Sequence, residues 1–192
     1  MKIVRTYFLR NMVCSCCMVL LRERLEKAGF SVSGIRLGEV TISYQDKNLT
    51  ENDFTSLVGE LGFEVIKDKN SRLVEQIKLA VIELIHQLNN ANSIIRKSDY
   101  LVEKLGMSYQ QLSKTFSQQE PVTLERFIIL HKIEKIKEMI DSGEYTLSEM
   151  AWMMDYSSVQ HLSAQFKQIT GLTPSEYKKS DHSIRRSLES LY

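Results

Sequence analysis

The three cysteines of this 192-residue chain lie close together, at Cys14, Cys16 and Cys17. Two thiolates separated by two residues at the start of a helix can converge on one soft ion, and the positive end of the helix dipole lowers their pKa. Cys14 and Cys17 are therefore predicted to bind a soft metal ion, with Met12 and Cys16 as additional candidate ligands. Two thiolates suit linear Cu(I) better than tetrahedral zinc, which takes four ligands.

The cysteine cluster has other interpretations. Clustered thiols in a reducing compartment can also carry out redox chemistry, and they can be incidental to a fold that serves as a dimerisation or ligand-binding module. Met12 is better explained as a residue that packs the loop than as a ligand. Because the sequence shows no Ser/His/Asp set, no paired carboxylates and no phosphate-binding glycine loop, we expect a protein that is not an enzyme.

Strand and helix signals alternate over residues 1–69, around the cysteines. The strands are predicted at 3–9, 32–37, 40–44 and 63–66, and the helices at about 16–28 and 51–61. The apolar stripe of the first helix is predicted to contain Val19, Leu20 or Leu21, Leu25 and Ala28. The order βαββαβ predicts a ferredoxin-like split sheet with both helices on one face.

The cysteines lie in a recognisable motif, because Met12 to Cys17 contains M-x-C-x-x-C between the first strand and the first helix. With this motif and Gly62-Phe63 before the last strand, residues 2–68 resemble the heavy-metal-associated domain of copper chaperones and metal-pumping ATPases. The resemblance implies a soft-metal site at the cysteine pair. Asn11 and Val13 replace the usual glycine and threonine of that family, and Cys16 is additional.

A second pattern begins with Thr146-Leu147-Ser148-Glu149, a capping box that starts a helix. The turn 155–158 interrupts its apolar stripe before a second helix, which ends at Gly171. A third, short helix starts at Thr173-Pro174. The apolar stripes of the first two helices are predicted to be Leu147, Met150, Ala151 and Met154, and Val159, Leu162, Phe166 and Ile169.

The second of these helices presents another face opposite its apolar stripe. At about 100° per residue, Gln160, His161, Ala164 and Lys167 lie on that face. Two short helices at a tight turn, the second with amide, hydroxyl and cationic side chains, have the geometry that fits a DNA major groove. Residues 146–177 are therefore interpreted as a helix-turn-helix unit closed by a short helix.

The run Phe166 to Tyr177, FKQITGLTPSEY, together with Met150-Ala151 and Tyr156, resembles the C-terminal signature of AraC/XylS-type transcription regulators. Asp155 stands where that family usually has the glycine of the turn, and Ala164 stands where many members have arginine. Aspartate tolerates a left-handed backbone better than most residues, so we expect the turn to form. The missing arginine removes one contact to phosphate or guanine.

The same pattern occurs earlier in the chain. Residues 101–116 predict a helix, a turn that contains Gly106, and a second helix. Between the two units, residues 124–140 predict one helix of roughly 25 Å, which can hold two recognition helices about one DNA turn, ~34 Å, apart. The outward face of the earlier unit's second helix is predicted to contain Gln110, Gln111, Ser113 and Lys114.

The resemblance implies which side chains contact base edges. They are Gln110, Ser113 and Lys114 in the first unit, and Gln160 and His161 in the second. Glutamine can form two hydrogen bonds with adenine, and lysine can reach guanine. The alternative is that these side chains form only a solvated polar face.

Trp152 lies opposite the apolar stripe of its helix. A large apolar ring there implies either that it docks on another surface, such as residues 1–68 or the transcription machinery, or that the long helix 124–140 buries it. His86 is interpreted as a surface histidine on an apolar helix over 73–88, which residues 89–93 end.

The charge of the chain gives no strong electrostatic signal for DNA. The formal net charge is +1, and residues 71–180 contain 13 Lys and Arg against 13 Asp and Glu. Phosphate contacts must therefore come from charges placed on one face, and we expect modest, salt-dependent affinity. The apolar runs are shorter than the ~20 residues of a membrane span. Because the N-terminus also lacks a cleavage-site pattern, a cytoplasmic protein is expected.

These patterns predict an α+β protein in three parts. Residues 1–69 are expected to form the ferredoxin-like domain, 70–180 an all-α DNA-binding domain, and 181–192 a polar tail, with 67–71 as a polar linker. We expect a sequence-specific transcription regulator of double-stranded DNA, controlled by Cu(I) or by thiol state. RNA polymerase and a second copy are further candidate partners. The alternative is a thiol-based metal carrier, or a redox or alkyl-acceptor protein with a DNA-binding domain.

Overall fold

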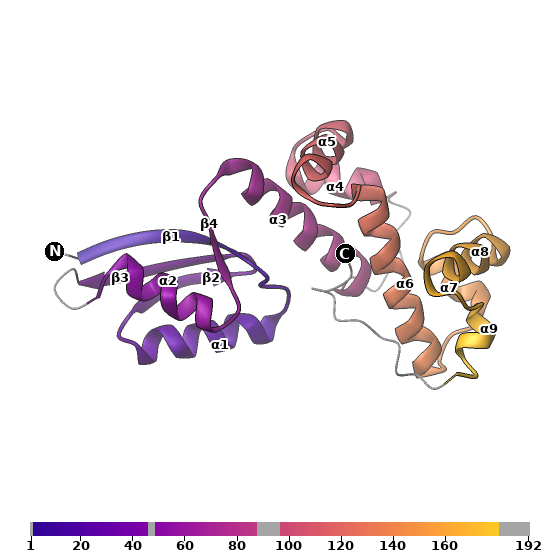
Figure 1. The fold of residues 1–192 in the computed structure, drawn as a ribbon, viewed down its shortest axis with the longest axis horizontal. Helices are drawn as coiled ribbons and strands as arrows, with labels where there is room; N and C mark the ends of the chain where they lie inside the picture. Colours follow the sequence, from indigo (N-terminus) through magenta and orange to yellow (C-terminus); the bar gives the residue numbers. More distant parts are fainter. Residues whose placement is uncertain (1, 46–48, 88–96, 181–192) are drawn as a thin grey trace. The chain divides into compact units, whose positions relative to one another are not determined.

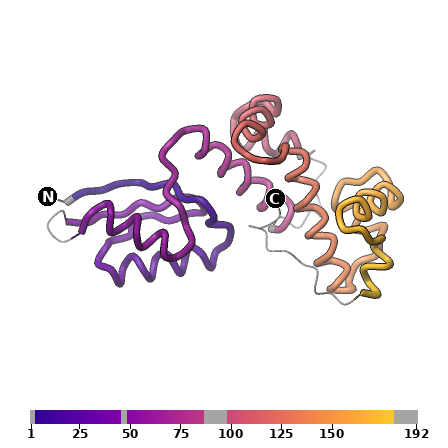
Figure 2. Tube along the Cα trace, in the orientation of Figure 1, coloured from indigo at the N-terminus to yellow at the C-terminus, as the bar shows by residue number. Residues whose placement is uncertain are grey.

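The computed structural model describes residues 2–45, 49–87 and 97–180. The chain divides into two compact units, Met1–Leu79 and Ala80–Tyr192, which can be followed by colour in Figure 1 and along the tube of Figure 2. The predicted tail and the predicted helix end at 89–93 lie outside the described residues. No helix within the described ranges has both the length and the apolar composition to cross a membrane.

The first unit contains a four-stranded antiparallel sheet in the order β2-β3-β1-β4. Helices alternate with the strands in the order β1-α1-β2-β3-α2-β4, which matches the predicted order of elements. The strands are β1 (Lys2–Arg10), β2 (Ser31–Arg36), β3 (Glu39–Gln45) and β4 (Glu64–Ile66), and the helices are α1 (Ser15–Lys27) and α2 (Glu51–Glu60). Because a helical region follows this sheet, the α+β class is confirmed.

The core of the first unit lies between the sheet and its two helices. Tyr7 and Leu9 alternate along β1 and point into the core. The ring of Phe54 on α2 stacks on Tyr7 with 4.2 Å between ring centroids. Leu21 and Leu25 of α1 pack in the same cluster. This core therefore fixes both ends of the loop between β1 and α1, which carries the first cysteine.

The buried face of α1 differs in part from the predicted stripe. Leu21 and Leu25 are fully buried one turn apart. Leu20 lies about 100° round the helix from Leu21, so the alternative with Leu20 in the stripe is wrong, and Cys17 extends the buried face instead. The predicted stripe residues that are exposed are Val19 (58%), Leu20 (42%) and Ala28.

Residues 67–71, predicted to be a polar linker, lead directly into a helix. This helix, α3, runs over Lys69–Ile82. The Ser71 amide donates a hydrogen bond of 2.8 Å to the Asp68 carboxylate, which satisfies one of the free amides of the first turn. The polar residues at this position therefore cap a helix. Helix caps and linkers are rich in the same polar residues, so composition alone does not distinguish them.

The first half of α3 packs within the first unit. The Arg72 guanidinium lies over the Phe8 ring, 4.3 Å from its centroid. The Glu75 carboxylate accepts a hydrogen bond of 3.1 Å from the Asn11 amide. The division between the two units falls inside α3, at 79/80, and the predicted domain boundary at 69/70 lies at the start of this helix.

The second unit is helical throughout its described elements. Two helix pairs, α4–α5 and α7–α8, come before and after the long helix α6, and the short helix α9 packs against α8 (Figure 1). After a π-helical turn at Glu83–Gln87, the helices are α4 (Lys97–Leu105), α5 (Tyr109–Gln119), α6 (Leu124–Ser142), α7 (Leu147–Met153), α8 (Val159–Thr170) and α9 (Pro174–Tyr177).

The long helix predicted for 124–140 is present as α6. Its 19 residues make it roughly 28 Å long. The Thr123 hydroxyl caps its start by accepting a hydrogen bond of 3.2 Å from the Arg126 amide. Gly143, with φ +70°, ends it in the left-handed conformation that suits glycine. The fully buried side chains of α6 include Leu124, Phe127, Ile133 and Ile136.

Capping boxes start three helices of the second unit. In each, the cap hydroxyl accepts from the backbone three residues on, and that residue's side chain accepts from the cap amide. The boxes predicted at 146 and 173 are confirmed, and a third, which also fits the pattern because glutamine can take the place of glutamate, was not predicted. The pairs are Thr146–Glu149, Thr173–Glu176 and Ser108–Gln111.

The turn of each helix pair contains one residue with positive φ. Gly106 has φ +66° after α4, and Asp155 has φ +57° after α7. The prediction that aspartate can replace the turn glycine is therefore confirmed. An L-residue pays a steric cost of roughly 1–2 kcal/mol in this conformation, less for aspartate.

We expect opposite effects from two substitutions at Asp155. Asp155→Gly should preserve or raise the free energy of unfolding, because glycine adopts positive φ freely. Asp155→Ala should lower it by about 1 kcal/mol. Urea unfolding followed by circular dichroism measures both, and Gly106→Ala serves as the matched control, with a loss of the same sign. A larger loss in Asp155→Gly than in Asp155→Ala would contradict this explanation of the turn.

Candidate functional site

Cys14 and Cys17 are brought together at the start of α1. Cys14 is the N-cap residue and Cys17 lies in the first turn, so their thiols face each other with 3.2 Å between the sulfur atoms. Both side chains are partly buried, whereas Cys16 is exposed. The predicted pair therefore converges in the structure, and Cys16 lies on the outer side of the helix.

The two thiols have opposite shifts in pKa. Burial raises the pKa of Cys14, but hydrogen bonds from the Cys17 thiol and from the backbone of Cys17 and Cys16 outweigh it, so the pKa lies below its usual value. Burial and the hydrogen bond with Cys14 raise the pKa of Cys17. Of the pair, Cys14 therefore becomes the thiolate first, and thiolates are the reactive and metal-binding form.

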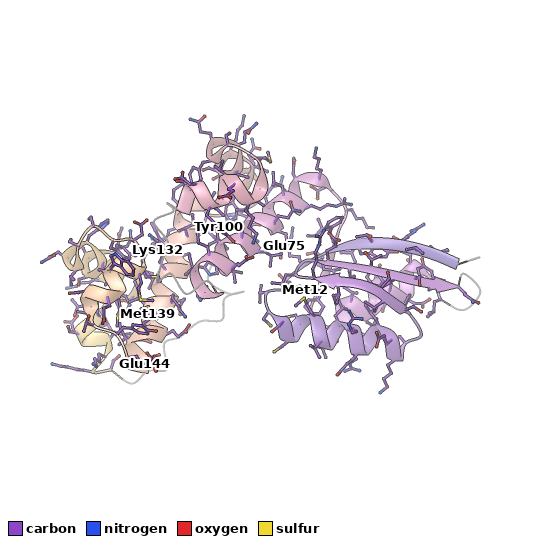
Figure 3. The ribbon with its side chains drawn as sticks, turned by 180° about the vertical axis from the view of Figure 1, so that it is seen from behind. Met12, Glu75, Tyr100, Lys132, Met139 and Glu144 are labelled. Carbon is purple, nitrogen blue, oxygen red and sulfur yellow. The ribbon has the colours of Figure 1, made fainter. Side chains whose placement is uncertain are left out.

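The loop before the cysteines is held from three sides. Asn11 has φ +70°, which asparagine tolerates, and its side-chain amide donates a 3.2 Å hydrogen bond to the Gly62 carbonyl. Its backbone amide donates to Glu75. Met12 is fully buried in the core of the first unit (Figure 3). Met12 thus anchors the loop from inside the core.

The chemistry of the thiol pair fits a soft ion or a disulfide. Two thiolates bound linearly to one metal at about 2.3 Å each lie on the order of 4.6 Å apart, so the two sulfur atoms, now 3.2 Å apart, would have to separate by about 1.4 Å to hold such an ion. In the described part of the chain, no group of three or more His, Cys, Asp or Glu side chains is arranged to hold a metal ion. Cys14 and Cys17 are thus a converging pair of sulfur atoms without a third donor of this kind beside them among the described residues.

On α5, the predicted polar face contains two kinds of side chain. Gln110 and Lys114 are exposed. The exposed Gln111 caps its own helix, because its side-chain oxygen accepts hydrogen bonds from the Ser108 amide and hydroxyl. Ser113 is only partly exposed, and its hydroxyl lies 3.3 Å from a carboxylate oxygen on α6. Gln110 and Lys114 are thus the side chains of this group that project into solvent without a capping role.

On α8, the predicted outward side chains are all exposed, and they are Gln160, His161, Ala164 and Lys167. Leu162 and Phe166, on the opposite side, are fully buried. His161 packs edge-on to Tyr156, with 5.3 Å between ring centroids, and its Nδ1 lies 3.1 Å from the Ser157 hydroxyl. The turn before α8 therefore orients the His161 ring.

Charge on these two helices is one-sided. Neither α5 nor α8 contains an aspartate or glutamate, while each carries an exposed lysine, Lys114 and Lys167. The even balance of charges over 71–180 therefore hides a local excess of positive charge. A count restricted to each predicted recognition helix would have found it.

Trp152 on α7 is 65% exposed. The interpretation that α6 buries this ring is therefore wrong, because α7 turns its opposite face, with Met150 and Ala151, toward the core. The residue numbering alone placed Trp152 opposite the stripe. Which face meets α6 depended on how α7 packs.

His86 is not a surface histidine. It is partly buried, and its Nε2 lies 3.3 Å from Nδ1 of the fully buried His131 on α6. His131 follows Phe127 by four residues, with 4.4 Å between their ring centroids. The apolar spacing of α6 therefore contained a signal for a buried histidine that the sequence analysis missed.

Comparison with known proteins bears on the second unit. Residues 101–180 match the helix-turn-helix domain family. The chain is also 29% identical over 99 residues to the xylose operon regulatory protein of Escherichia coli K12, an alignment that covers 52% of this chain and 25% of the relative. Proteins of that name from the O6:H1 and O157:H7 strains match equally.

The chain spans about a quarter of the length of these curated relatives. No solved structure matches it significantly. The family match, residues 101–180, lies in the helical unit and contains the end of α4 and the whole of α5, α6, α7, α8 and α9.

Proposed function

We propose that this protein is a sequence-specific DNA-binding transcription regulator of the AraC/XylS type. The observation that carries the proposal is the pair of helices α5 and α8, which expose glutamine and lysine and contain no acidic residue. They lie in the part of the chain that matches the helix-turn-helix domain family. Similarity to a xylose operon regulatory protein supports the same role.

Each helix pair acts as a helix-turn-helix unit in this proposal. The second helix of each pair enters a major groove. There, Gln110 and Gln160 each form two hydrogen bonds with an adenine, one as donor and one as acceptor, and Lys114 donates a hydrogen bond to a guanine. His161 and Lys167 contact base edges or phosphates beside them. As one rigid helix of roughly 28 Å, α6 spaces the two units for successive grooves, which lie ~34 Å apart.

Selection of bound sequences from a random pool of double-stranded DNA tests the proposal. The full chain should enrich one motif with two half-sites about one helical turn apart. Binding to that motif should weaken steeply between 50 and 200 mM salt, roughly as the number of phosphate contacts predicts. Failure to enrich any motif, with random DNA bound as well as selected DNA, would overturn sequence-specific regulation.

For the first unit, we propose a ferredoxin-like domain of the heavy-metal-associated type that controls the regulator. The Cys14–Cys17 pair would hold Cu(I) through its two sulfur atoms, whereas Met12 is buried in the core and Cys16 is exposed on the outer side of α1. The 3.2 Å between the sulfur atoms also fits a redox sensor. In that case an oxidant such as a peroxide takes two electrons from the thiols, two protons are released and one S–S bond forms.

The second candidate function is a thiol-based metal carrier, or a redox or alkyl-acceptor protein attached to a DNA-binding domain. The lowered pKa of Cys14 favours it, because a thiolate is also a nucleophile. A carrier hands its metal to an acceptor protein without changing DNA affinity, whereas a sensor changes DNA affinity when the thiols are occupied. Measuring DNA affinity with and without Cu(I) therefore separates the two functions.

RNA polymerase is a further proposed partner, and Trp152 is the candidate contact because it is 65% exposed on α7. Trp152→Ala should lower transcription from a template with the selected site by about tenfold, as expected for an aromatic contact at the centre of an interface. DNA affinity should stay within about twofold. Trp152→Phe is the conservative control, and equal transcription by wild type and Trp152→Ala would contradict a polymerase contact.

Assembly and location follow from the same proposal. A homodimer would double the number of half-sites, and the ratio of protein to DNA in the saturated complex measures it. A regulator of this kind works beside bacterial DNA, so we propose a cytoplasmic location and no catalytic activity.

A further inference from the structure

Glu125 lies in the first turn of α6 and contacts α5. One of its oxygens, Oε1, accepts hydrogen bonds from the Tyr109 hydroxyl at 3.2 Å and from the Ser113 hydroxyl at 3.3 Å. Tyr109 and Ser113 are four residues apart, so they lie on one face of α5 in successive turns. A single carboxylate oxygen therefore holds two turns of α5 to α6.

These hydrogen bonds lie beside the exposed face of α5. Gln110 and Lys114 each follow one of the two hydroxyl residues, so they lie about 100° further round the helix. Leu112 and Phe116, on the other side of the hydroxyls, are fully buried. Apolar packing is non-directional, whereas hydrogen bonds have preferred angles. The contacts with Glu125 therefore resist rotation of α5 about its own axis.

We propose that Glu125 is a positioning residue, which sets the rotation of α5 so that Gln110 and Lys114 face the DNA bases. This inference rests on the proposed DNA-binding function. It also assigns Ser113 to holding the helix, in place of the base contact that the sequence predicts.

The second helix pair lacks this arrangement. Val159 of α8 occupies the position that Tyr109 has in α5, and valine has no hydroxyl to donate. Ser163 occupies the position of Ser113. Ser163→Ala therefore makes the same chemical change as Ser113→Ala without touching Glu125.

The ionisation of Tyr109 reports on the contact without DNA. Burial, the negative charge of Glu125 and the hydrogen bond to it raise the pKa of Tyr109 to about 12. Removing the carboxylate removes two of these three causes. In Glu125→Ala the pKa of Tyr109 should consequently be lower than in wild type, even if the helix keeps its place.

The central experiment compares Glu125→Ala with wild type on the DNA site selected by the full chain. Affinity for that site should fall about tenfold, which corresponds to about 1.4 kcal/mol, because Gln110 and Lys114 lose their fixed orientation toward the bases. Affinity for random DNA should not fall. Glu125→Gln keeps an acceptor oxygen, so it should retain affinity within about threefold.

Two control variants separate positioning from simple charge. Glu103 on α4 is also exposed, and Glu103→Gln removes one negative charge without changing the hydrogen bonds of Glu125. Less negative charge favours DNA binding by electrostatics, so Glu103→Gln should leave affinity unchanged or higher, opposite to Glu125→Ala. Ser163→Ala should keep affinity, whereas the double change Tyr109→Phe/Ser113→Ala should reproduce the loss seen in Glu125→Ala.

Tyrosine ionisation, followed by NMR of chains labelled at tyrosine Cζ, completes the test, with Tyr109→Phe assigning the signal. A lower Tyr109 pKa and a selective loss of specific affinity in Glu125→Ala support the proposal. Unchanged specific affinity in Glu125→Ala, or a loss that Ser163→Ala shares, overturns it. If wild type selects no DNA sequence, the proposed function fails and this inference fails with it. If wild type does select a sequence and Glu125→Ala binds it equally well, only the inference about Glu125 fails.

Discussion

Replacing Lys114 and Gln160 together by alanine should lower specific DNA affinity by about 30-fold or more, because each good base contact discriminates by ~1–3 kcal/mol and 1.4 kcal/mol is tenfold. Both side chains are exposed and lie off the buried stripes of α5 and α8. The free energy of unfolding should therefore change by less than about 0.5 kcal/mol. Electrophoretic mobility shift on the selected site and on random DNA, with urea unfolding in parallel, measures both quantities.

A matched control distinguishes loss of base contacts from loss of charge. Lys27 of α1 is exposed in the first unit, and Gln119 is exposed at the end of α5. The double variant Lys27→Ala/Gln119→Ala removes one lysine and one glutamine, as the test variant does, and it should bind like wild type. If Lys114 contacts phosphate as well, the slope of log affinity against log salt should fall by ~0.9. If Lys114→Ala/Gln160→Ala binds the selected site and random DNA as tightly as wild type does, α5 and α8 do not contact the DNA bases through these side chains.

Loss of the thiol pair should remove metal binding and, with it, control of DNA binding. Cys14→Ser/Cys17→Ser should bind Cu(I) far more weakly than wild type, because hydroxyl oxygen is a poor ligand for a soft ion. In wild type, Cu(I) should change operator affinity by about 5- to 150-fold, the usual range of coupling between two sites. Anaerobic titration of the selected DNA, with and without Cu(I) and then with Zn(II), measures this change.

Cys16 requires its own controls, since it is exposed next to the pair. Cys16→Ser alone should preserve Cu(I) affinity, and the triple serine variant should remove any binding that Cys16 retains in the double variant. If wild type binds neither ion more tightly than the triple variant, the metal-sensor proposal fails and the DNA-binding proposal stands. Metal binding without a change in operator affinity would instead support the carrier.

Local sequence patterns predicted the helices and turns well, because hydrogen bonds within a few residues determine them. Thr146 and Thr173 begin helices with the hydroxyl and carboxylate arrangement expected of a capping box. Asp155 forms the positive-φ turn without glycine. The order of strands and helices in the first unit also follows from local apolar spacing.

Some sequence patterns are compatible with two different local structures, and for these the prediction was wrong or left both alternatives open. Residues 67–71 have the composition of a linker, yet Asp68 caps α3. Leu20 and Leu21 both continue an apolar stripe, and only packing in the core of the first unit selects Leu21. Trp152 was assigned to either a buried or a docking surface, and its exposure follows from how α7 packs on its neighbours.

The sequence by itself determined which residue types lie on which helix face, including Cys14 next to Cys17 and the lysines of α5 and α8, because helical periodicity is a local property. Only the tertiary structure decided which of these side chains already have a partner. The sequence around Ser113 is the same whether its hydroxyl faces DNA or α6. In the folded chain, Glu125 of α6 lies close enough to accept a hydrogen bond from that hydroxyl. Contacts between residues far apart in the chain depend on packing, which no short-range pattern encodes.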